Sequence, residues 1–189
     1  MARFIKFDEH NYSCFSLENT RLLITAAAEV DVVCKQLCRE LDAHSRANCI
    51  NRYHAPLVNH YPNMLHFEVD LPQYGLHLTP WKDWQPDHPP LGWTASNKLK
   101  HHRHTEYHQA SLKNVLNAIA GLYVVCLYLY NAKVRLKALA PRPCLLSPGQ
   151  GFVWLYEEMH RVSAITAESA NHTRPPGPFS FRKEIANQA

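Results

Sequence analysis

Residues 112–129, LKNVLNAIAGLYVVCLYL, decide the fold of this chain. From residue 118 to residue 130 the side chains are apolar in every direction around a helix, and such a helix is buried among other elements. The run is too short for a membrane core, which needs roughly twenty apolar residues, so we expect no membrane association. Three asparagines close the run at its ends: Asn114, Asn117 and Asn131. The stretch predicts the buried central helix of a bundle, extending over 112–139, with Gly121 allowing close packing. Ser111 is expected to be its cap or a joint with the preceding helix.

A long amphipathic helix is predicted over residues 16–43. Ser16 can accept a hydrogen bond as its N-cap, and Glu18 suits the positive first turn. Apolar residues recur at spacings of three and four, and they are Leu23, Ala26, Ala27, Val30, Cys34, Leu37 and Leu41. This stripe predicts the buried face of the helix.

Residues 61–92 have the pattern of an extended strap that follows a shorter helix at about 48–60. Apolar and polar residues alternate in LHFEVDLPQYGLHLTPW, residues 65–81, as they do in half-buried strands. The apolar positions that share a face are Leu65, Phe67, Val69, Leu71, Leu76 and Leu78. A small β-hairpin is therefore expected, with Trp81, Trp84 and Trp93 anchoring the strap onto the helices.

Composition places the chain among folded proteins of one domain. It has 189 residues, 46% hydrophobic and 19% charged, which predicts a single domain over 1–189 with its core at 16–140. A short helix at 152–165 and a Pro-rich tail at 168–189 would follow. The net charge of +4 is too weak by itself to indicate a nucleic-acid partner. The predicted fold class is mostly α, a helical bundle with a small extended or β-hairpin insertion.

The six cysteines include no CxxC pair, so no zinc site built on cysteine is expected. The start of the sequence, MARFIKFDEH, lacks the apolar core of a signal peptide. We therefore expect reduced thiols and a cytoplasmic protein.

The stretch 97–108, NKLKHHRHTEYH, carries the densest polar chemistry of the chain. A helix is predicted to begin near Ala95 and to include it. On one straight helix, four residues at helical spacing would form a single stripe, and they are Asn97, His101, His104 and His108. Lys100 would lie beside this stripe, and the long side chain of Arg103 could reach it.

Three interpretations of this stretch are open. Imidazoles that titrate near neutral pH can act as acid and base on the 2′-hydroxyl and leaving oxygen of RNA, while Arg and Lys stabilise the phosphate charge. A metal site is a second possibility, because His104 and His108 are four residues apart, but no third ligand is evident and the nearby cations disfavour a divalent ion. The third is a hydrated polar face, or histidines bonded to an acidic edge of the helix at 16–43.

The order of these features resembles the HEPN superfamily of all-helical nucleotide-binding and RNase domains. The matching parts are AEVDVVCKQLC at 28–38, LTPWKDW at 78–84, the block W-x3-N-x2-KHHR that begins at Trp93, and ASLKNVLNAIAGLYV at 110–124. The resemblance covers roughly residues 16–131. Active members of that superfamily cut single-stranded RNA without metal, using an Arg and a His separated by about four to six residues, as in Arg103-x4-His108. These residues meet across a dimer cleft.

The resemblance implies a metal-independent endoribonuclease without a cofactor, acting as a homodimer on single-stranded RNA in a toxin–antitoxin system or in antiviral defence. Arg103 would stabilise the phosphorane, and His108 or His101 would be the acid or base. Asn97, Lys100 and His104 would position the RNA, and a regulatory protein or antitoxin is a possible partner. The alternative is a non-catalytic helical module that binds a partner protein or a nucleotide.

Overall fold

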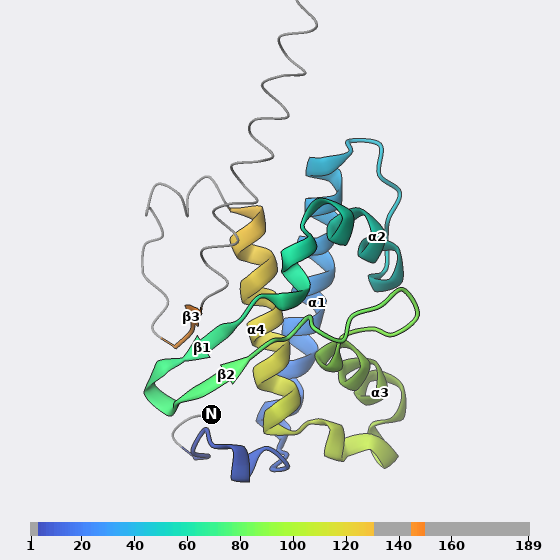
Figure 1. The fold of residues 1–189 in the computed structure, drawn as a ribbon. Helices are drawn as coiled ribbons and strands as arrows, with labels where there is room; N and C mark the ends of the chain where they lie inside the picture. The colour runs from blue at the N-terminus through green and yellow to red at the C-terminus, as the bar shows by residue number, and fades with distance from the viewer. Residues whose placement is uncertain (1–3, 131–144, 150–189) are drawn as a thin grey trace, which may run out of the picture.

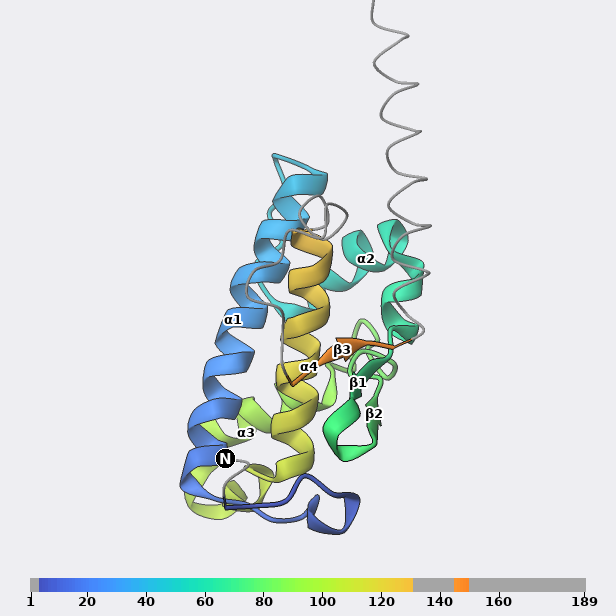
Figure 2. The same cartoon turned by 90° about the vertical axis from the view of Figure 1, so that its left-hand side faces the viewer.

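The computed structural model describes residues 4–130 and 145–149, and these form a mostly α-helical fold with a small antiparallel sheet. Helices α1 (Leu17–Leu41) and α4 (Leu112–Leu129) run side by side through the molecule. Helices α2 (Ile50–His60) and α3 (Leu91–Glu106) pack against them, and the sheet covers a further face of α4 (Figures 1 and 2). The predicted fold class is confirmed.

Helix α1 follows its sequence pattern closely. Ser16 is the N-cap, and its side chain accepts a hydrogen bond from the backbone N–H of Asn19 at 3.1 Å. The predicted stripe is buried from Leu23 to Leu37, whereas Leu41 in the last turn is only half-buried. The hydroxyl of Tyr53 on α2 donates to the carboxylate of Asp31 at 3.0 Å, which ties the second helix to the first.

Helix α4 is the buried central helix that the sequence predicts. Ser111 caps it by accepting from the backbone N–H of Asn114 at 3.3 Å. By length and composition alone α4 could cross a membrane, but 61% of it is buried inside the fold, in the manner of a core helix. The predicted extension of this helix to residue 139 lies outside the described residues, as do Cys144, the helix predicted at 152–165 and the tail at 168–189.

The predicted strap contains the hairpin and several single turns. Strand β1 (Val69–Leu71) pairs antiparallel with β2 (Leu76–Leu78). The tight connection includes the 3₁₀ turn η3 (Pro72–Tyr74) and Gly75, whose φ of 62° is easily adopted only without a Cβ. The sequence did not predict a third strand, β3 (Ser147–Pro148), which pairs with the other side of β1. Because β3 is far away in sequence and only two residues long, no local alternation marks it.

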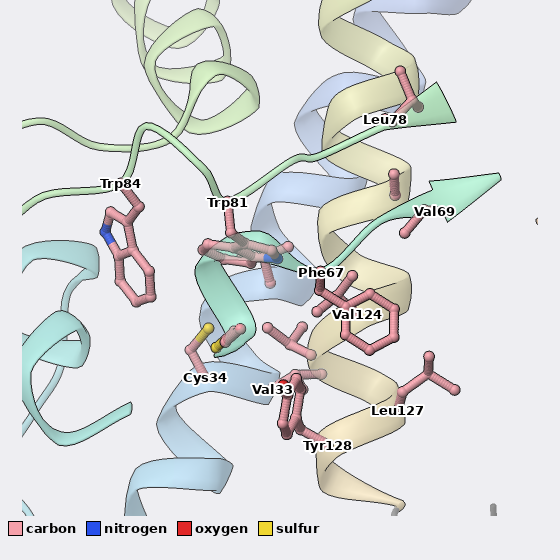
Figure 3. Packing of buried hydrophobic residues seen from close by; sticks show 14 of the residues in the cluster. Val33, Cys34, Phe67, Val69, Leu78, Trp81, Trp84, Val124, Leu127 and Tyr128 are labelled. Carbon is pink, nitrogen blue, oxygen red and sulfur yellow. The ribbon is translucent and has the colours of Figure 1, made fainter. Parts of the chain in front are cut away.

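Trp81 and Trp84 hold the strap against the helices, as predicted, whereas the third predicted anchor, Trp93, belongs to helix α3. Trp81 and Trp84 are both 1% exposed, and their ring centroids are 4.8 Å apart. The indole N–H of Trp81 donates to the backbone carbonyl of Gly121 on α4 at 3.2 Å. Figure 3 shows these rings with Phe67 and Val69 of the strap, packed onto side chains of α1 and α4. The core therefore lies between the two long helices and the strap.

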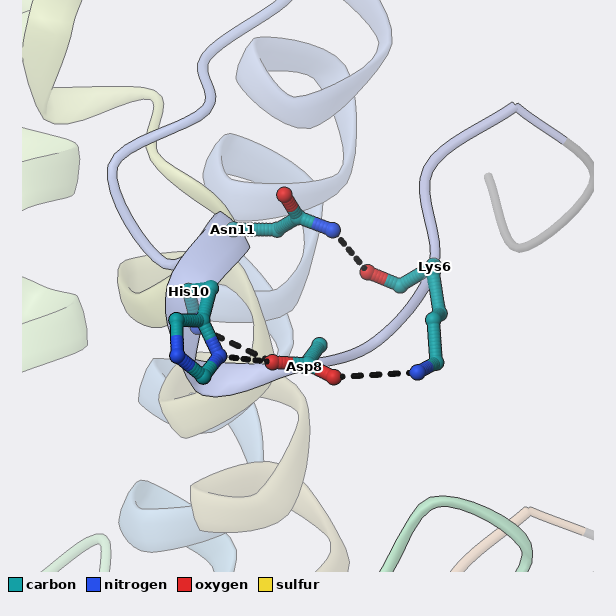
Figure 4. Close-up of polar contacts among 4 residues, drawn as sticks. All are labelled: Lys6, Asp8, His10 and Asn11. Atoms are coloured by element: carbon teal, nitrogen blue, oxygen red, sulfur yellow. Dashed lines mark hydrogen bonds and ion pairs between the residues drawn. The ribbon is translucent and has the colours of Figure 1, made fainter.

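The N-terminal segment is fixed by a local polar network around Asp8 (Figure 4). The Asp8 carboxylate accepts from the ring and the backbone N–H of His10, at 2.7 and 3.1 Å, and pairs with Lys6 at 3.1 Å. These hydrogen bonds hold the pKa of the Asp8 carboxyl well below its usual range. Asp8 is the N-cap of the short 3₁₀ helix η1 (Glu9–Asn11). The side chain of Asn11 donates back to the Lys6 carbonyl at 3.0 Å.

Helices α3 and α4 approach closely at Gly92 on α3, which begins at Leu91, four residues before the predicted start. A methyl group on Gly92 would lie 2.8 Å from the Cβ of Ala118 on α4. Gly121, which the sequence suggested as the close-packing position, does lie against neighbours, but it leaves room for a methyl group. A methyl group there would meet Pro80 and Trp81 at 3.7 Å, an ordinary van der Waals distance.

Gly92→Ala is expected to lower the free energy of unfolding by about 1–3 kcal/mol, because α3 and α4 must move apart to admit the methyl group. Gly121→Ala is the matched control. It should be neutral or stabilise by up to about 1 kcal/mol, since Ala has the better helix propensity and nothing obstructs it. Urea denaturation followed by circular dichroism measures both. Equal effects of the two substitutions would contradict the contact at Gly92.

Candidate functional site

The stretch 97–108 does not form the single straight helix that its four-residue stripe requires. Helix α3 kinks at His102, which has φ −134° and ψ 35°, and ends at Glu106. His108 belongs to the following 3₁₀ turn, η4 (Tyr107–Gln109). The stripe from Asn97 to His108 is therefore interrupted, and its two halves do not share one helical register. The pattern was misleading because spacing predicts alignment only along a continuous helix.

All six predicted site residues are exposed on the surface of the chain: Asn97, Lys100, His101, Arg103, His104 and His108. The rings of His101 and His102 are neighbours, with centroids 6.4 Å apart. Within the described residues, no hydrogen bond or ion pair joins these imidazoles to a carboxylate of α1. The exposure fits a surface that receives a ligand or a partner, and it equally fits a hydrated polar face.

The carboxylate of Glu106, next to this surface in the chain, pairs with two residues. It lies 3.7 Å from the ammonium of Lys98 and 3.8 Å from Nε2 of His108. His108 also lies 2.9 Å from the side-chain nitrogen of Gln109. In the part of the chain that the structure describes, Lys100 and Arg103 have no carboxylate partner. The positive charge of α3 is therefore least neutralised between residues 100 and 104.

Arg103 is the predicted site residue that lines a groove. The groove has a volume of about 650 Å³ and lies between the first turns of α1 and the end of α3. The α1 residues that line it are Leu17, Glu18, Thr20, Arg21, Ile24 and Thr25. Arg21 is already paired with Glu18 through contacts of 2.6 and 2.9 Å, which lower the pKa of Glu18. The unpaired cation of the groove is therefore Arg103.

A second set of polar residues was missed by the sequence interpretation. Asp70 and His77 are cross-strand partners in the hairpin, and Nδ1 of His77 lies 2.7 Å from the Asp70 carboxylate. His77 also lines a polar cleft of about 270 Å³ together with Lys82 and Lys113. The sequence did hold a signal, because both residues occupy polar positions of the alternating pattern on either side of the turn at Gly75.

Metal ligands do not cluster in the described residues: no three His, Cys, Asp or Glu side chains gather there as a metal site would need. The five described cysteines are free thiols. Cys34 and Cys38 are buried, Cys126 is half-buried, and Cys14 and Cys49 are exposed. Burial raises the pKa of Cys38 to about 11, so this thiol stays protonated at neutral pH.

Comparison with known proteins finds no match among family models, curated proteins or solved structures. The functional argument therefore depends on the residues of this chain.

Proposed function

We propose that this protein binds single-stranded RNA on the exposed segment Lys100–His104 and cleaves it without a metal ion. The observation that carries the proposal is the composition of this segment: Lys100 and Arg103 are exposed without a carboxylate partner, beside three exposed imidazoles. Unpaired cations are what an RNA backbone requires, because each contact replaces counterions around a phosphate. Imidazoles beside them supply groups that can gain or lose a proton near neutral pH.

The chemistry would be transfer of the phosphodiester to the neighbouring 2′-hydroxyl. One imidazole, His108 or His101, removes the 2′-hydroxyl proton, and the 2′-oxygen attacks phosphorus. A second imidazole protonates the departing 5′-oxygen, and the upstream product ends in a 2′,3′-cyclic phosphate. The planar guanidinium of Arg103 stabilises the charge that builds on the phosphorane oxygens. Asn97, Lys100 and His104 hold the strand in place.

Two copies of the chain would complete the site. The imidazoles of one copy are exposed, and the groove that contains Arg103 is open. A homodimer related by a two-fold axis brings the Arg103 of one copy to the histidines of the other and excludes water between them. This is the arrangement of the HEPN superfamily that the sequence resembles. The corresponding role is a cytoplasmic endoribonuclease of a toxin–antitoxin or antiviral system, controlled by a regulatory protein.

A non-catalytic helical module that binds a partner protein or a nucleotide is the second candidate. The exposure of His101 and His104 favours it, because the groove that Arg103 lines contains no imidazole of this segment. A binding surface needs no such cleft.

The deciding experiment incubates the purified full-length protein with a mixed pool of RNA in EDTA. We expect cleavage products that end in 2′,3′-cyclic phosphate. Binding without cleavage supports the non-catalytic module, and a protein that neither binds nor cleaves single-stranded RNA removes both RNA functions.

Lys100→Ala is expected to weaken RNA binding and to reduce the slope of log affinity against log salt by about one unit, because one phosphate contact is lost. Arg39→Ala, in the last turn of α1 at the opposite end from the groove, is the control for loss of one positive charge. Fluorescence anisotropy with a labelled oligonucleotide at several salt concentrations measures the slopes. A slope that Lys100→Ala leaves unchanged excludes a phosphate contact at this residue.

A further inference from the structure

We infer that Phe15 is a stacking platform for an unpaired base of the RNA. This inference rests on the proposed RNA-binding function and deepens it, because it gives the reason for a preference for single strands. Phe15 is 51% exposed, which is high for a phenylalanine in an ordered segment. An exposed aromatic ring next to unpaired cations is the combination that single-stranded nucleic acids bind.

The ring of Phe15 lies where α1 begins and α3 ends. It contacts Tyr107 of η4 edge-on, with centroids 5.6 Å apart and planes at 87°. A perpendicular contact leaves at least one face of each ring uncovered by the other. Figure 2 places the N-terminal segment, the start of α1 and the end of α3 at the same end of the bundle.

The backbone presents this ring rigidly. Phe15 forms an antiparallel bridge with Ser111, and the N–H groups of Leu112 and Lys113 donate to the carbonyls of Cys14 and Tyr12 at 2.8 and 3.1 Å. These contacts fix Phe15 to the start of α4, the most buried helix. A side chain that is already held in position loses little entropy when a ligand stacks on it.

The cation for the adjoining phosphate is Arg103, in the groove beside the first turns of α1. Leu17, two residues after Phe15, and Arg103, four residues before Tyr107, line the same groove. Phe15 and Tyr107 are therefore close in sequence to residues on the two sides of that groove. A nucleotide with its base on Phe15 can direct its phosphate toward Arg103. The unpaired positive charge of Arg103 in this groove is complementary to the phosphate of RNA.

The test compares Phe15→Ala with Phe15→Trp in the full-length protein, using a labelled single-stranded RNA and a duplex of the same sequence. Phe15→Ala should weaken single-strand binding roughly tenfold, because one base loses its aromatic partner. The salt slope should stay unchanged, since no phosphate contact is removed. Phe15→Trp should restore affinity, and its added indole fluorescence should be quenched by the single strand. Duplex binding should be insensitive to either change, because the bases are already stacked. Phe4→Ala is the control for loss of an exposed phenylalanine, since Phe4 is 90% exposed and lies well before the start of α1 in the chain.

The outcomes separate this inference from the proposed function. If Lys100→Ala changes the salt slope while Phe15→Ala leaves single-strand affinity unaltered, RNA binding stands and the stacking platform is wrong. Sedimentation without RNA tests the alternative that Phe15 belongs to a protein interface. That alternative is supported if Phe15→Ala dissociates a dimer and RNA affinity falls only in proportion to the loss of dimer. If the unaltered protein binds no single-stranded RNA, both proposals fail.

Discussion

Trp81→Ala is expected to lower the free energy of unfolding by about 3–5 kcal/mol, the range for a large aromatic side chain removed from a core. Trp81 is 1% exposed, packs on Trp84 and donates a hydrogen bond to the Gly121 carbonyl on α4. The substitution leaves a cavity and also removes the link between the strap and the central helix. A domain of this size has roughly 5–15 kcal/mol in total, so a large share of its stability would be lost.

The matched pair Trp81→Phe and Trp84→Phe separates packing from the hydrogen bond. The indole N–H of Trp84 is buried without a partner in the described part of the chain. Trp81→Phe removes the hydrogen bond from the indole N–H to the Gly121 carbonyl, which keeps its bond within α4, and this loss should cost about 0.5–1.5 kcal/mol more than the packing change. Trp84→Phe lacks that extra cost. Urea denaturation measures all three variants, and a loss below about 1 kcal/mol for Trp81→Ala would show that the strap is not anchored here.

Arg103→Ala is expected to reduce the rate of RNA cleavage in EDTA by about a hundredfold or more, the effect of removing one group that stabilises transition-state charge. Arg103 is exposed and unpaired, so its loss should leave the fold intact, and unchanged urea denaturation is the check. Arg103→Lys should recover only part of the rate, because an ammonium cannot form the two parallel hydrogen bonds of a guanidinium. Arg52→Ala on α2 is the control for charge. Equal rates for Arg103→Ala and the unaltered protein would remove Arg103 from the site.

Mixing two inactive variants tests whether the site is shared between two copies. If Arg103 of one chain acts with His108 of the other, a mixed dimer of Arg103→Ala and His108→Ala holds one intact site. Random exchange of subunits should then recover about a quarter of the activity, because half of the dimers are mixed. Recovery with His101→Ala in place of His108→Ala would identify His101 as the acid or base. No recovery with either would place the whole site in one chain.

Helical periodicity and capping residues allowed much of the fold to be predicted from the sequence. The stripe of α1 from Leu23 to Leu37 is buried, and Ser16 and Ser111 cap the two long helices as predicted. These features depend on residues within a few positions of one another, so the sequence displays them directly. The hairpin was predictable for the same reason, because alternation about Gly75 is local.

The candidate site was harder to predict from the sequence than the fold, because it depends on tertiary structure. The residue types between 97 and 108 indicated acid–base or phosphate chemistry, but their alignment assumed a straight helix, and the kink at His102 removed that assumption. The single-domain prediction remains a prediction, since parts of the chain lie outside the described residues.

The sequence by itself determined the main helices and the hairpin, where the two long helices begin and which faces they bury, because these follow from neighbours in the chain. Only the tertiary structure decided that Gly92, and not Gly121, lies too close to a neighbouring helix to admit a methyl group. It alone brought Phe15 to Tyr107 and Arg103 to the first turns of α1. The members of each pair are roughly ninety residues apart in the sequence. The periodicity within one helix or strand cannot encode a contact between two different elements. The direction in which helices cross, the bend in α3 and the third strand are set by packing of the whole chain.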